Sequence, residues 1–286
     1  MGNGIGRRRA ESTVSQNLHS AATDGSVTVR RDGDILRVTL DRPAQRNSLS
    51  HIMVESFISV LTGAATDDSL RAVHITGAGS DFCAGADWVA TNSDAQQRPR
   101  TGALLRRIPH LAHRLIELVY TIQLPVVCSV RGWAAGLGCN LALAADFTIA
   151  ANNATFWEPF VARGFSPDSG ASWLLPRLVG LTRAKEMLLL GEKVSATHAA
   201  DWGLIYRAVD HSELNSASED VLSRLASGPT VAIGLTKQAI YYGQHATLSQ
   251  SMTQELFDLE LSCRTEDFKE GLAAFREKRP PRFRGR

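Results

Sequence analysis

Hydrophobic and polar positions follow two different periods along this chain, and the first ordered pattern begins near Val27. Apolar and polar residues alternate on both sides of an Asp-Gly pair in SVTVRRDGDILRVTLDRP (26–43), which is typical of a β-hairpin. In LSHIMVESFISVLTGAATDD (49–68) the apolar residues recur at helical spacing, which predicts an amphipathic helix. Short apolar runs predict buried strands in RAVHITG (71–77), VVCSVRG (126–132) and FTIA (147–150).

The order of these elements indicates an α/β protein with a helical C-terminal region. A long helix is expected from about Gly102 to Gln123, where Pro125 stops it. Strands that alternate with helices favour mostly parallel pairing. Beyond Ser212 the strand pattern disappears, and four helical segments follow, at 212–228, 230–244, 248–264 and 265–279. We therefore expect an α/β core over residues 26–211 and a helical region over residues 212–286.

Composition excludes several classes of protein. Of the 286 residues, 44% are hydrophobic and 21% are charged, which is ordinary for a soluble globular protein. The formal charge of +2 calls for neither a nucleic acid nor an anionic membrane as partner. No apolar run approaches the roughly 20 residues that span a bilayer. Residues 1–25 are polar and lack the apolar stretch of a secretory signal, so we expect a disordered tail on a cytoplasmic protein.

The four cysteines indicate neither disulfides nor a metal site. Cys83, Cys128, Cys139 and Cys263 are scattered, without CxxC or His-rich ligand spacing. Free thiols in a reducing compartment are the simplest interpretation. No metal is expected.

Two loops of small residues carry the candidate chemistry. DFCAGADW (81–88) follows one predicted strand, and GWAAGLGCN (132–140) follows another. Glycine and alanine let the backbone approach a ligand closely, and the N–H groups that open a helix carry partial positive charge. Two such donors on one oxygen would form an oxyanion hole, which stabilises the charge that develops on a carbonyl. A phosphate cradle is the rival interpretation, but neither GxxxxGK[ST] nor GxGxxG is present.

Five segments in order resemble the enoyl-CoA hydratase/isomerase, or crotonase, superfamily. They are DRPAQRNSLS (41–50), SDFCAGADW (80–88), GWAAGLGCNLALAAD (132–146), GFSPDSGASWLLPRLVG (164–180) and FREKRPPRFRGR (275–286). The resemblance covers about residues 26–286. It implies a crotonase-like spiral of ββα units with a C-terminal helical trimerisation region. It also implies a homotrimer or dimer of trimers, an acyl-CoA substrate, and no cofactor other than the coenzyme A of that substrate.

The resemblance also implies roles for single residues. The oxyanion donors would be the N–H groups of Ala86 and Leu137. The substrate would lie against the loops that hold them, at Ala84, Gly85, Asp87, Trp88, Gly136 and Asn140. Arg46 and the adjacent Asn47 stand where similar proteins place a basic residue near the CoA phosphates, although a solvated arginine after a strand is an equal alternative. Lys278 and Phe283 fall where relatives bring a second subunit's tail toward the adenine. Asp87 itself we interpret as a helix N-cap.

The catalytic acids of the family's hydratases are missing. Those enzymes use two glutamates to activate water, at the positions of Asn140 and Phe160 in this sequence. Neither an amide nor a phenyl ring takes a proton from water at neutral pH. Asp168, in SPDSGASW, matches the aspartate that serves as base in similar isomerases. The alternative is that Asp168 only caps the helix that starts near Ser169.

Three functions remain open from the sequence. The leading hypothesis is double-bond isomerisation of an acyl-CoA, with Asp168 as base and its pKa raised by an aromatic pocket wall of Trp157 and Phe160. The second is an enoyl-CoA hydratase with an atypical site, and the third is a non-catalytic acyl-CoA-binding protein. Glu158 and Glu117 are rival candidates for the base.

Overall fold

The computed structural model describes residues 25–87 and 100–286. The tail predicted over residues 1–25 therefore lies outside the described residues except for Gly25, and Trp88 lies outside them as well. Within the described ranges, no helix is long and apolar enough to cross a membrane.

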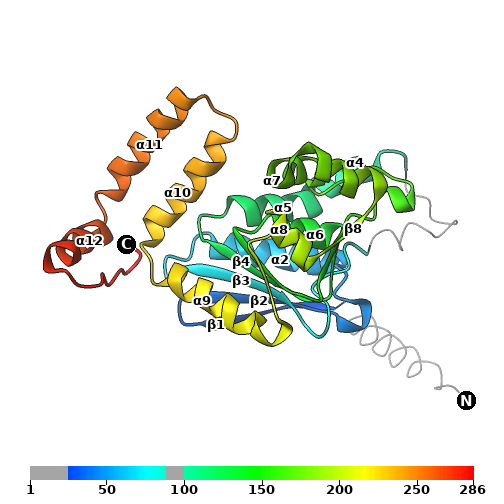
Figure 1. Cartoon of the computed structure of the whole chain (residues 1–286), viewed down its shortest axis with the longest axis horizontal. Coiled ribbons are helices and arrows are strands. Elements are labelled where there is room, and N and C mark those ends of the chain that lie inside the picture. Colours follow the sequence, from blue (N-terminus) through cyan, green and yellow to red (C-terminus); the bar gives the residue numbers. More distant parts are fainter. Residues whose placement is uncertain (1–24, 88–99) are drawn as a thin grey trace, which may run out of the picture.

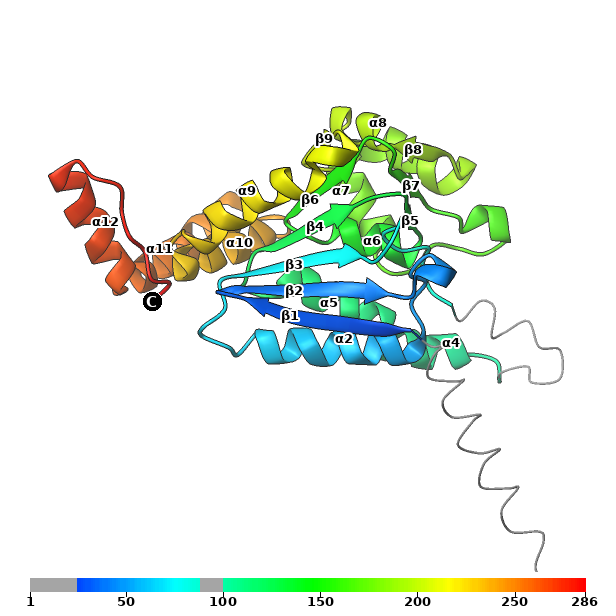
Figure 2. The same cartoon turned by 90° about the horizontal axis from the view of Figure 1, so that it is seen from below.

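A six-stranded sheet forms the centre of the molecule (Figures 1 and 2). Its strands in spatial order are β1 (Ser26–Asp32), β2 (Ile35–Asp41), β3 (Ala72–Gly77), β4 (Val126–Val130), β6 (Phe147–Ala151) and β9 (Arg207–Val209). β1 and β2 pair antiparallel through the predicted Asp-Gly hairpin, and the other neighbours pair parallel. A second sheet holds β5 (Trp133–Ala135), β7 (Thr155–Trp157) and β8 (Lys193–Ser195).

Helices cover both faces of the large sheet (Figure 1). One face packs against α2 (His51–Ala64), α5 (Ala112–Thr121), α6 (Leu137–Leu143), α7 (Ala171–Lys185) and α8 (Ala196–Asp201). The opposite face packs against α9 (Leu214–Ala226). Cys128 therefore belongs to one hydrophobic core and Val127 to the other, and every residue of β4 is buried. Coverage on both sides explains why the central strands read as continuous apolar runs.

The single long helix predicted between Gly102 and Gln123 is wrong. The segment forms α4 (Ala103–Arg107), the 3₁₀ turn η2 (Ile108–His110) and then α5. Pro109 lies in that turn and has no N–H to donate, so the helical hydrogen bonds are interrupted there. The backbone at Leu111 leaves the helical region, with φ −120° and ψ −95°.

The four C-terminal helices are confirmed. After α9 come α10 (Thr230–Gly243), α11 (Leu248–Ser262) and α12 (Glu266–Glu277), which extend away from the sheet (Figures 1 and 2). Lys237 of α10 pairs with Asp146 of the core at 2.7 Å, and this ion pair ties α10 to the core. None of the residues of α11 is buried. The remaining short helices are η1 (Pro43–Gln45), η3 (Val161–Arg163), η4 (Glu186–Leu190) and η5 (His211–Glu213).

Candidate active site

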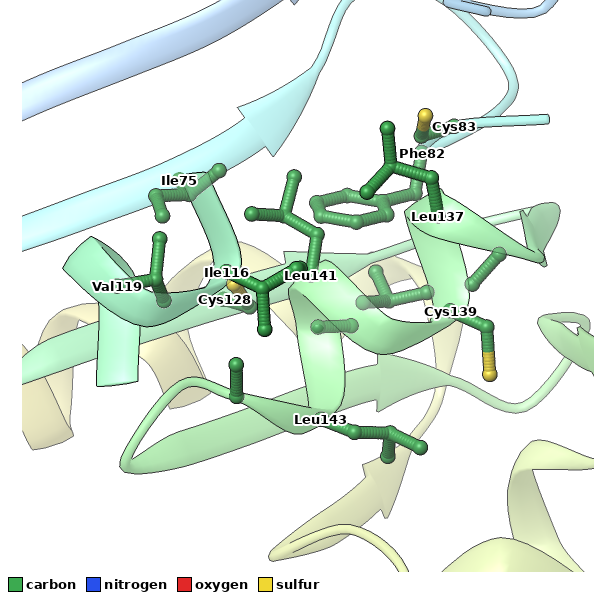
Figure 3. Close-up of a cluster of buried hydrophobic side chains, with 14 of the residues drawn as sticks. Ile75, Phe82, Cys83, Ile116, Val119, Cys128, Leu137, Cys139, Leu141 and Leu143 are labelled. Atoms are coloured by element: carbon green, nitrogen blue, oxygen red, sulfur yellow. The ribbon is translucent and has the colours of Figure 1, made fainter. Parts of the chain in front are cut away.

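The two glycine-rich loops lie side by side at the carboxyl ends of their strands. Figure 3 shows Phe82 and Cys83 next to Leu137, the first residue of α6. A Cβ placed on Gly138 would come within 2.4 Å of the Cys83 carbonyl oxygen. The backbones of the first loop and of α6 are therefore nearly in contact, and only glycine leaves room for this approach.

Hydrogen bonds hold the loop 81–87 on two sides. On one side, Cys83 exchanges two backbone hydrogen bonds of 2.8 and 2.9 Å with the strand segment around β5. On the other side, the Leu49 N–H donates to the Gly85 carbonyl (2.8 Å), and the Leu49 carbonyl accepts from the Asp87 N–H (3.0 Å). The loop is thus fixed as a short connecting strand between two neighbours.

This pairing sets the direction of the Ala86 N–H. Leu49 bonds to the residues before and after Ala86 in a parallel bridge, so the N–H of Ala86 itself points to the opposite side, toward β5 and α6. Gly85 makes this possible, because its φ of +103° is a conformation that residues with a side chain rarely adopt. No described backbone carbonyl accepts a hydrogen bond from the Ala86 N–H.

The second candidate donor is the N–H of Leu137. Gly136 precedes it with φ +51° and ψ −122°, and the Gly136 N–H donates to the Trp157 carbonyl at 2.8 Å. Because Leu137 opens α6, its N–H has no partner within the helix. The Cβ position of Gly85 lies 3.8 Å from the Leu137 nitrogen, so the two donor-bearing segments are adjacent.

Asp168 stands in the loop that precedes α7. The N-cap of α7 is Gly170, and no side chain caps this helix, so the interpretation of Asp168 as a helix cap is wrong. The Asp168 carboxylate accepts a hydrogen bond of 2.8 Å from the Ser169 hydroxyl. Burial raises the pKa of Asp168, and the Ser169 hydrogen bond and the nearby His113 lower it by less. A partly buried carboxylate with a raised pKa is suited to accept a proton.

A hollow next to Ser169, the residue after Asp168, has a volume of about 360 Å³ and an apolar, aromatic wall. Its lining residues are His113, Ile116, Glu117, Tyr120, Ser169, Gly170, Trp173 and Leu174. Tyr120 and Trp173 meet edge to face, with ring centroids 5.3 Å apart. Both aromatic residues also line a larger hollow of about 600 Å³ that lies against α10. The two hollows therefore share part of their aromatic wall.

Asn140, Phe160 and Glu158 are fully or almost fully buried beside this site. Asn140 has no exposed surface, and its Nδ2 donates a long hydrogen bond of 3.5 Å to the Asp168 carbonyl. Phe160 is 3% exposed and packs edge to face against Phe165, with centroids 5.6 Å apart. Glu158 has no exposed surface. The structure therefore brings together an amide, a phenyl ring and two carboxyl groups.

Trp157 does not form the wall that we expected beside Asp168. Its ring lies 5.9 Å from that of Trp133, and the Lys193 ammonium stands over it at 5.1 Å. The Trp157 N–H donates to the Gly191 carbonyl at 2.9 Å. The ring therefore packs on the smaller sheet, and the aromatic wall of the hollow next to Ser169 comes from Tyr120 and Trp173 instead.

Residues near the first loop have mainly internal contacts. The Asn47 side chain is buried and holds the chain together by accepting from the Arg42 N–H and donating to the Ala78 and Asp81 carbonyls, at 2.7–2.9 Å. The Asp87 carboxylate accepts from the Arg42 guanidinium at 2.7 Å. The helix that Asp87 was expected to cap lies outside the described residues. Arg46 is exposed at the surface.

The helix α12, which ends just before Lys278, and the C-terminus lie far from α6 (Figure 1). Lys278 ends α12 in a left-handed conformation, and the ring of Phe283 packs near Gly271. The Phe283 carbonyl accepts a hydrogen bond of 3.2 Å from Arg71, which precedes the amino end of β3. One chain alone therefore does not bring them to the Ala86–Leu137 site.

The environments of Glu117 and Cys83 give neither residue a catalytic role. Glu117 is exposed and pairs with Arg114 at 2.7 Å, although it reaches the rim of the hollow. Burial raises the pKa of the Cys83 thiol to about 12, which keeps it protonated and unreactive. Across residues 25–87 and 100–286 no group of three or more His, Cys, Asp or Glu side chains could hold a metal ion.

Sequence reasoning missed His113, Tyr120 and Trp173. Trp173 stands in a quoted motif, but the helix that carries His113 and Tyr120 has no recognisable motif. A signal was available in the amphipathic spacing of residues 112–121, whose polar side faces the opening beside Ser169. Only the tertiary structure shows which end of that helix meets Asp168.

Comparisons with known proteins agree with this fold. A family model described as enoyl-CoA hydratase/isomerase matches residues 30–286. The chain is 38% identical to the 1,2-epoxyphenylacetyl-CoA isomerase of Escherichia coli (strain K12), over 88% of this chain and 95% of that protein. It is 39% identical to a probable enoyl-CoA hydratase of Rhodobacter capsulatus, over 87% of this chain and 94% of that protein. The crystal structure of an enoyl-CoA hydratase from Polaromonas sp. JS666 superposes with a TM-score of 0.85 at 32% identity, over 91% of this chain and 100% of that chain. The fold class expected from the sequence is confirmed.

Proposed function

The chain belongs to the enoyl-CoA hydratase/isomerase family, and on that premise we propose that it moves a double bond within an acyl-CoA thioester, with Asp168 as the base. The observation that carries this proposal is the environment of Asp168, compared with those of Asn140 and Phe160. Asp168 is a partly exposed carboxylate with no capping role, whereas Asn140 and Phe160 supply no second base.

The reaction needs one proton acceptor and one site for negative charge. For a 3-enoyl-CoA, the Asp168 carboxylate takes a proton from C2, and the electron pair of the broken C–H bond passes to the thioester oxygen as an enolate. The same carboxyl group then returns the proton to C4, while the electrons flow back and leave the double bond between C2 and C3. No atom is gained or lost, and no cofactor is required beyond the coenzyme A of the substrate.

The geometry of the two loops supports the placement of the thioester oxygen. The Ala86 N–H points toward α6, and the Leu137 N–H opens that helix without an acceptor among the described backbone carbonyls. Both groups lie on backbone that is fixed by neighbouring hydrogen bonds, so they need no reorganisation when charge develops. We expect both nitrogens about 3 Å from one acyl oxygen. A bound acyl-CoA whose carbonyl points away from both loops would contradict this placement.

The apolar wall of Tyr120 and Trp173 supports an apolar acyl group as substrate. The similar isomerase from E. coli is named for an aromatic acyl-CoA, which is compatible with such a wall. We propose that the acyl group passes beside these rings, while Arg46 and the tail residues Lys278 and Phe283 of a second subunit contact the CoA portion.

Assembly into a trimer or a dimer of trimers is part of the proposal. Large apolar side chains are exposed along α11, among them Leu248 (77%), Leu256 (66%) and Phe257 (64%). Single exposed apolar residues are common, but several on one helix that buries nothing are typical of an interface. The extended position of this helix leaves it open to a neighbouring subunit.

Hydration is the second candidate, because a hydratase stands among the relatives at 39% identity and because Glu158 adds a second carboxyl group beside the site. Non-catalytic binding is the third. A panel of 2-enoyl- and 3-enoyl-CoA substrates separates them. Isomerase activity converts the 3-enoyl substrates to conjugated thioesters, a hydratase consumes the conjugated ones, and a binding protein does neither.

A further inference from the structure

Glu158 is a buried acid to which the proposed reaction gives no role. It follows directly after β7 and has no exposed surface. Neither of its carboxyl oxygens has an oxygen or nitrogen hydrogen-bond partner among the described residues, and the Cys139 thiol lies within hydrogen-bonding reach of it. An ionised carboxylate in such a place would cost several kcal/mol, so a group like this keeps its proton.

The groups around Glu158 also favour its protonated form. Burial raises its pKa well above the ordinary value, the Cys139 thiol opposes this by less, and the charge of Asp168 raises it further. Cys139 is itself buried and protonated, because burial raises the pKa of its thiol. Beyond Asp168 stands His113, which favours the ionised form of Asp168. When two neighbouring carboxyl groups compete for a proton, the more buried one holds it and the more exposed one ionises.

Asn140 carries a buried acceptor of the kind that a protonated carboxyl group can satisfy. It follows Cys139 in α6 and is fully buried, and its Oδ1 has no hydrogen-bond donor among the described residues. Its Nδ2 already points to the Asp168 carbonyl at 3.5 Å. A buried amide oxygen without a donor is costly, and a neutral carboxyl group carries one O–H donor.

We propose that Glu158 is protonated at neutral pH and donates its O–H to Asn140 Oδ1, so that the Asn140 amide is held toward the Asp168 backbone and Asp168 stays the ionised carboxylate. Glu158 is then a positioning residue that acts through Asn140 and does not touch the substrate. This role rests on the proposed function, in which Asp168 is the base. This hydrogen bond would also explain how Asn140, at the position of a hydratase glutamate, keeps a fixed orientation in the site.

Infrared difference spectroscopy tests the protonation of Glu158 without any assay of activity. The full-length protein at pH 7.5 should show the carbonyl stretch of a buried, protonated carboxyl group, and this band should be absent from Glu158→Gln. A parent protein without the band, or a Glu158→Gln variant that keeps it, would overturn the proposal. This measurement stands even if the protein proves not to be an isomerase.

Kinetics of two variants test the positioning role. Glu158→Gln keeps a neutral donor of the same size, so its kcat on a 3-enoyl-CoA should stay within about twofold of the parent. Glu158→Leu removes the donor, so its kcat should fall about tenfold while KM for the acyl-CoA is unchanged. Cooperative thermal unfolding of both variants checks that they fold. Equal loss of kcat in both variants, or parental kcat in Glu158→Leu, would contradict the role, and if Glu158→Leu does not fold, the Gln variant and the infrared band decide.

Discussion

Replacement of Gly138 by alanine probes the contact on which the two-loop site depends. The added Cβ would lie 2.4 Å from the Cys83 carbonyl oxygen and 2.6 Å from the Cys83 Cβ. Ordinary van der Waals contact begins near 3.4 Å, so the loop and the helix must separate by about 1 Å. All seven residues of α6 are buried, so the helix cannot tilt freely and the shift must pass into loop 81–87. That loop carries Ala86, three residues beyond Cys83.

A 1 Å misplacement of catalytic groups costs on the order of 10²-fold in rate. We therefore expect Gly138→Ala to lower kcat for 3-enoyl-CoA isomerisation by about 10²-fold, and to cost about 1–3 kcal/mol in the free energy of unfolding. The assay follows the absorbance of the conjugated thioester, and calorimetry gives the affinity for a saturated acyl-CoA, which should change much less.

Gly63→Ala is the matched control. Gly63 is also helical, but a Cβ at that position meets nothing within 4 Å, so this variant should keep parental kcat and unfold no more easily. A Gly138→Ala protein that is folded and turns over as fast as Gly63→Ala would refute the reasoning, because the closeness of the two loops would then not matter for the reaction.

Three further predictions concern the loop conformation, the pH dependence and the assembly. Gly136→Val should lose at least about 10²-fold in kcat, because the φ of +51° at Gly136 disfavours a β-branched residue. Leu137→Ala keeps its backbone N–H and should retain more activity, although its packing is weaker. Kinetics of the two variants, measured side by side at low temperature, would show this difference. Burial raises the pKa of Asp168 above its ordinary value of 3.8. Because the base must be ionised to accept a proton, kcat/KM should fall as the pH drops through that raised pKa. A pH profile in which kcat/KM falls only below pH 3.8 would contradict this prediction. Light scattering at micromolar concentration should give three or six times the 31.0 kDa of one chain, and a stable monomer would contradict the trimer.

Most of the fold was predictable because it follows local patterns. The Asp32–Gly33 pair defines a hairpin, and short apolar runs define strands that are covered on both faces. The C-terminal helices were predictable from their spacing alone. The long helix predicted over 102–123 was wrong because Pro109 removes an N–H in the middle of the segment, although helical spacing of apolar residues continues on both sides of it.

The candidate site was predictable in part. The resemblance indicated Asp168 and the two donor loops, and the structure removes the capping alternative for Asp168 because α7 starts at a glycine N-cap. The wall of the hollow was not predictable, since Trp157 turns to the smaller sheet and Tyr120 comes from a helix with no motif. The burial of Glu158 was not predictable either. A sequence shows which residues are acidic, but only packing shows that one of them is buried without an oxygen or nitrogen partner among the described residues.

The comparison of the parent protein with Asp168→Asn tests the central claim most directly. Both are supplied with a 3-enoyl-CoA and, separately, with crotonyl-CoA, while the absorbance of the conjugated thioester is followed. We expect the parent to isomerise the first substrate much faster than it hydrates the second, and Asp168→Asn to lose 10²–10⁴-fold in isomerisation with nearly unchanged acyl-CoA affinity. Brisk hydration by the parent, with Asp168→Asn hydrating equally well, would contradict the assignment of Asp168 as the base.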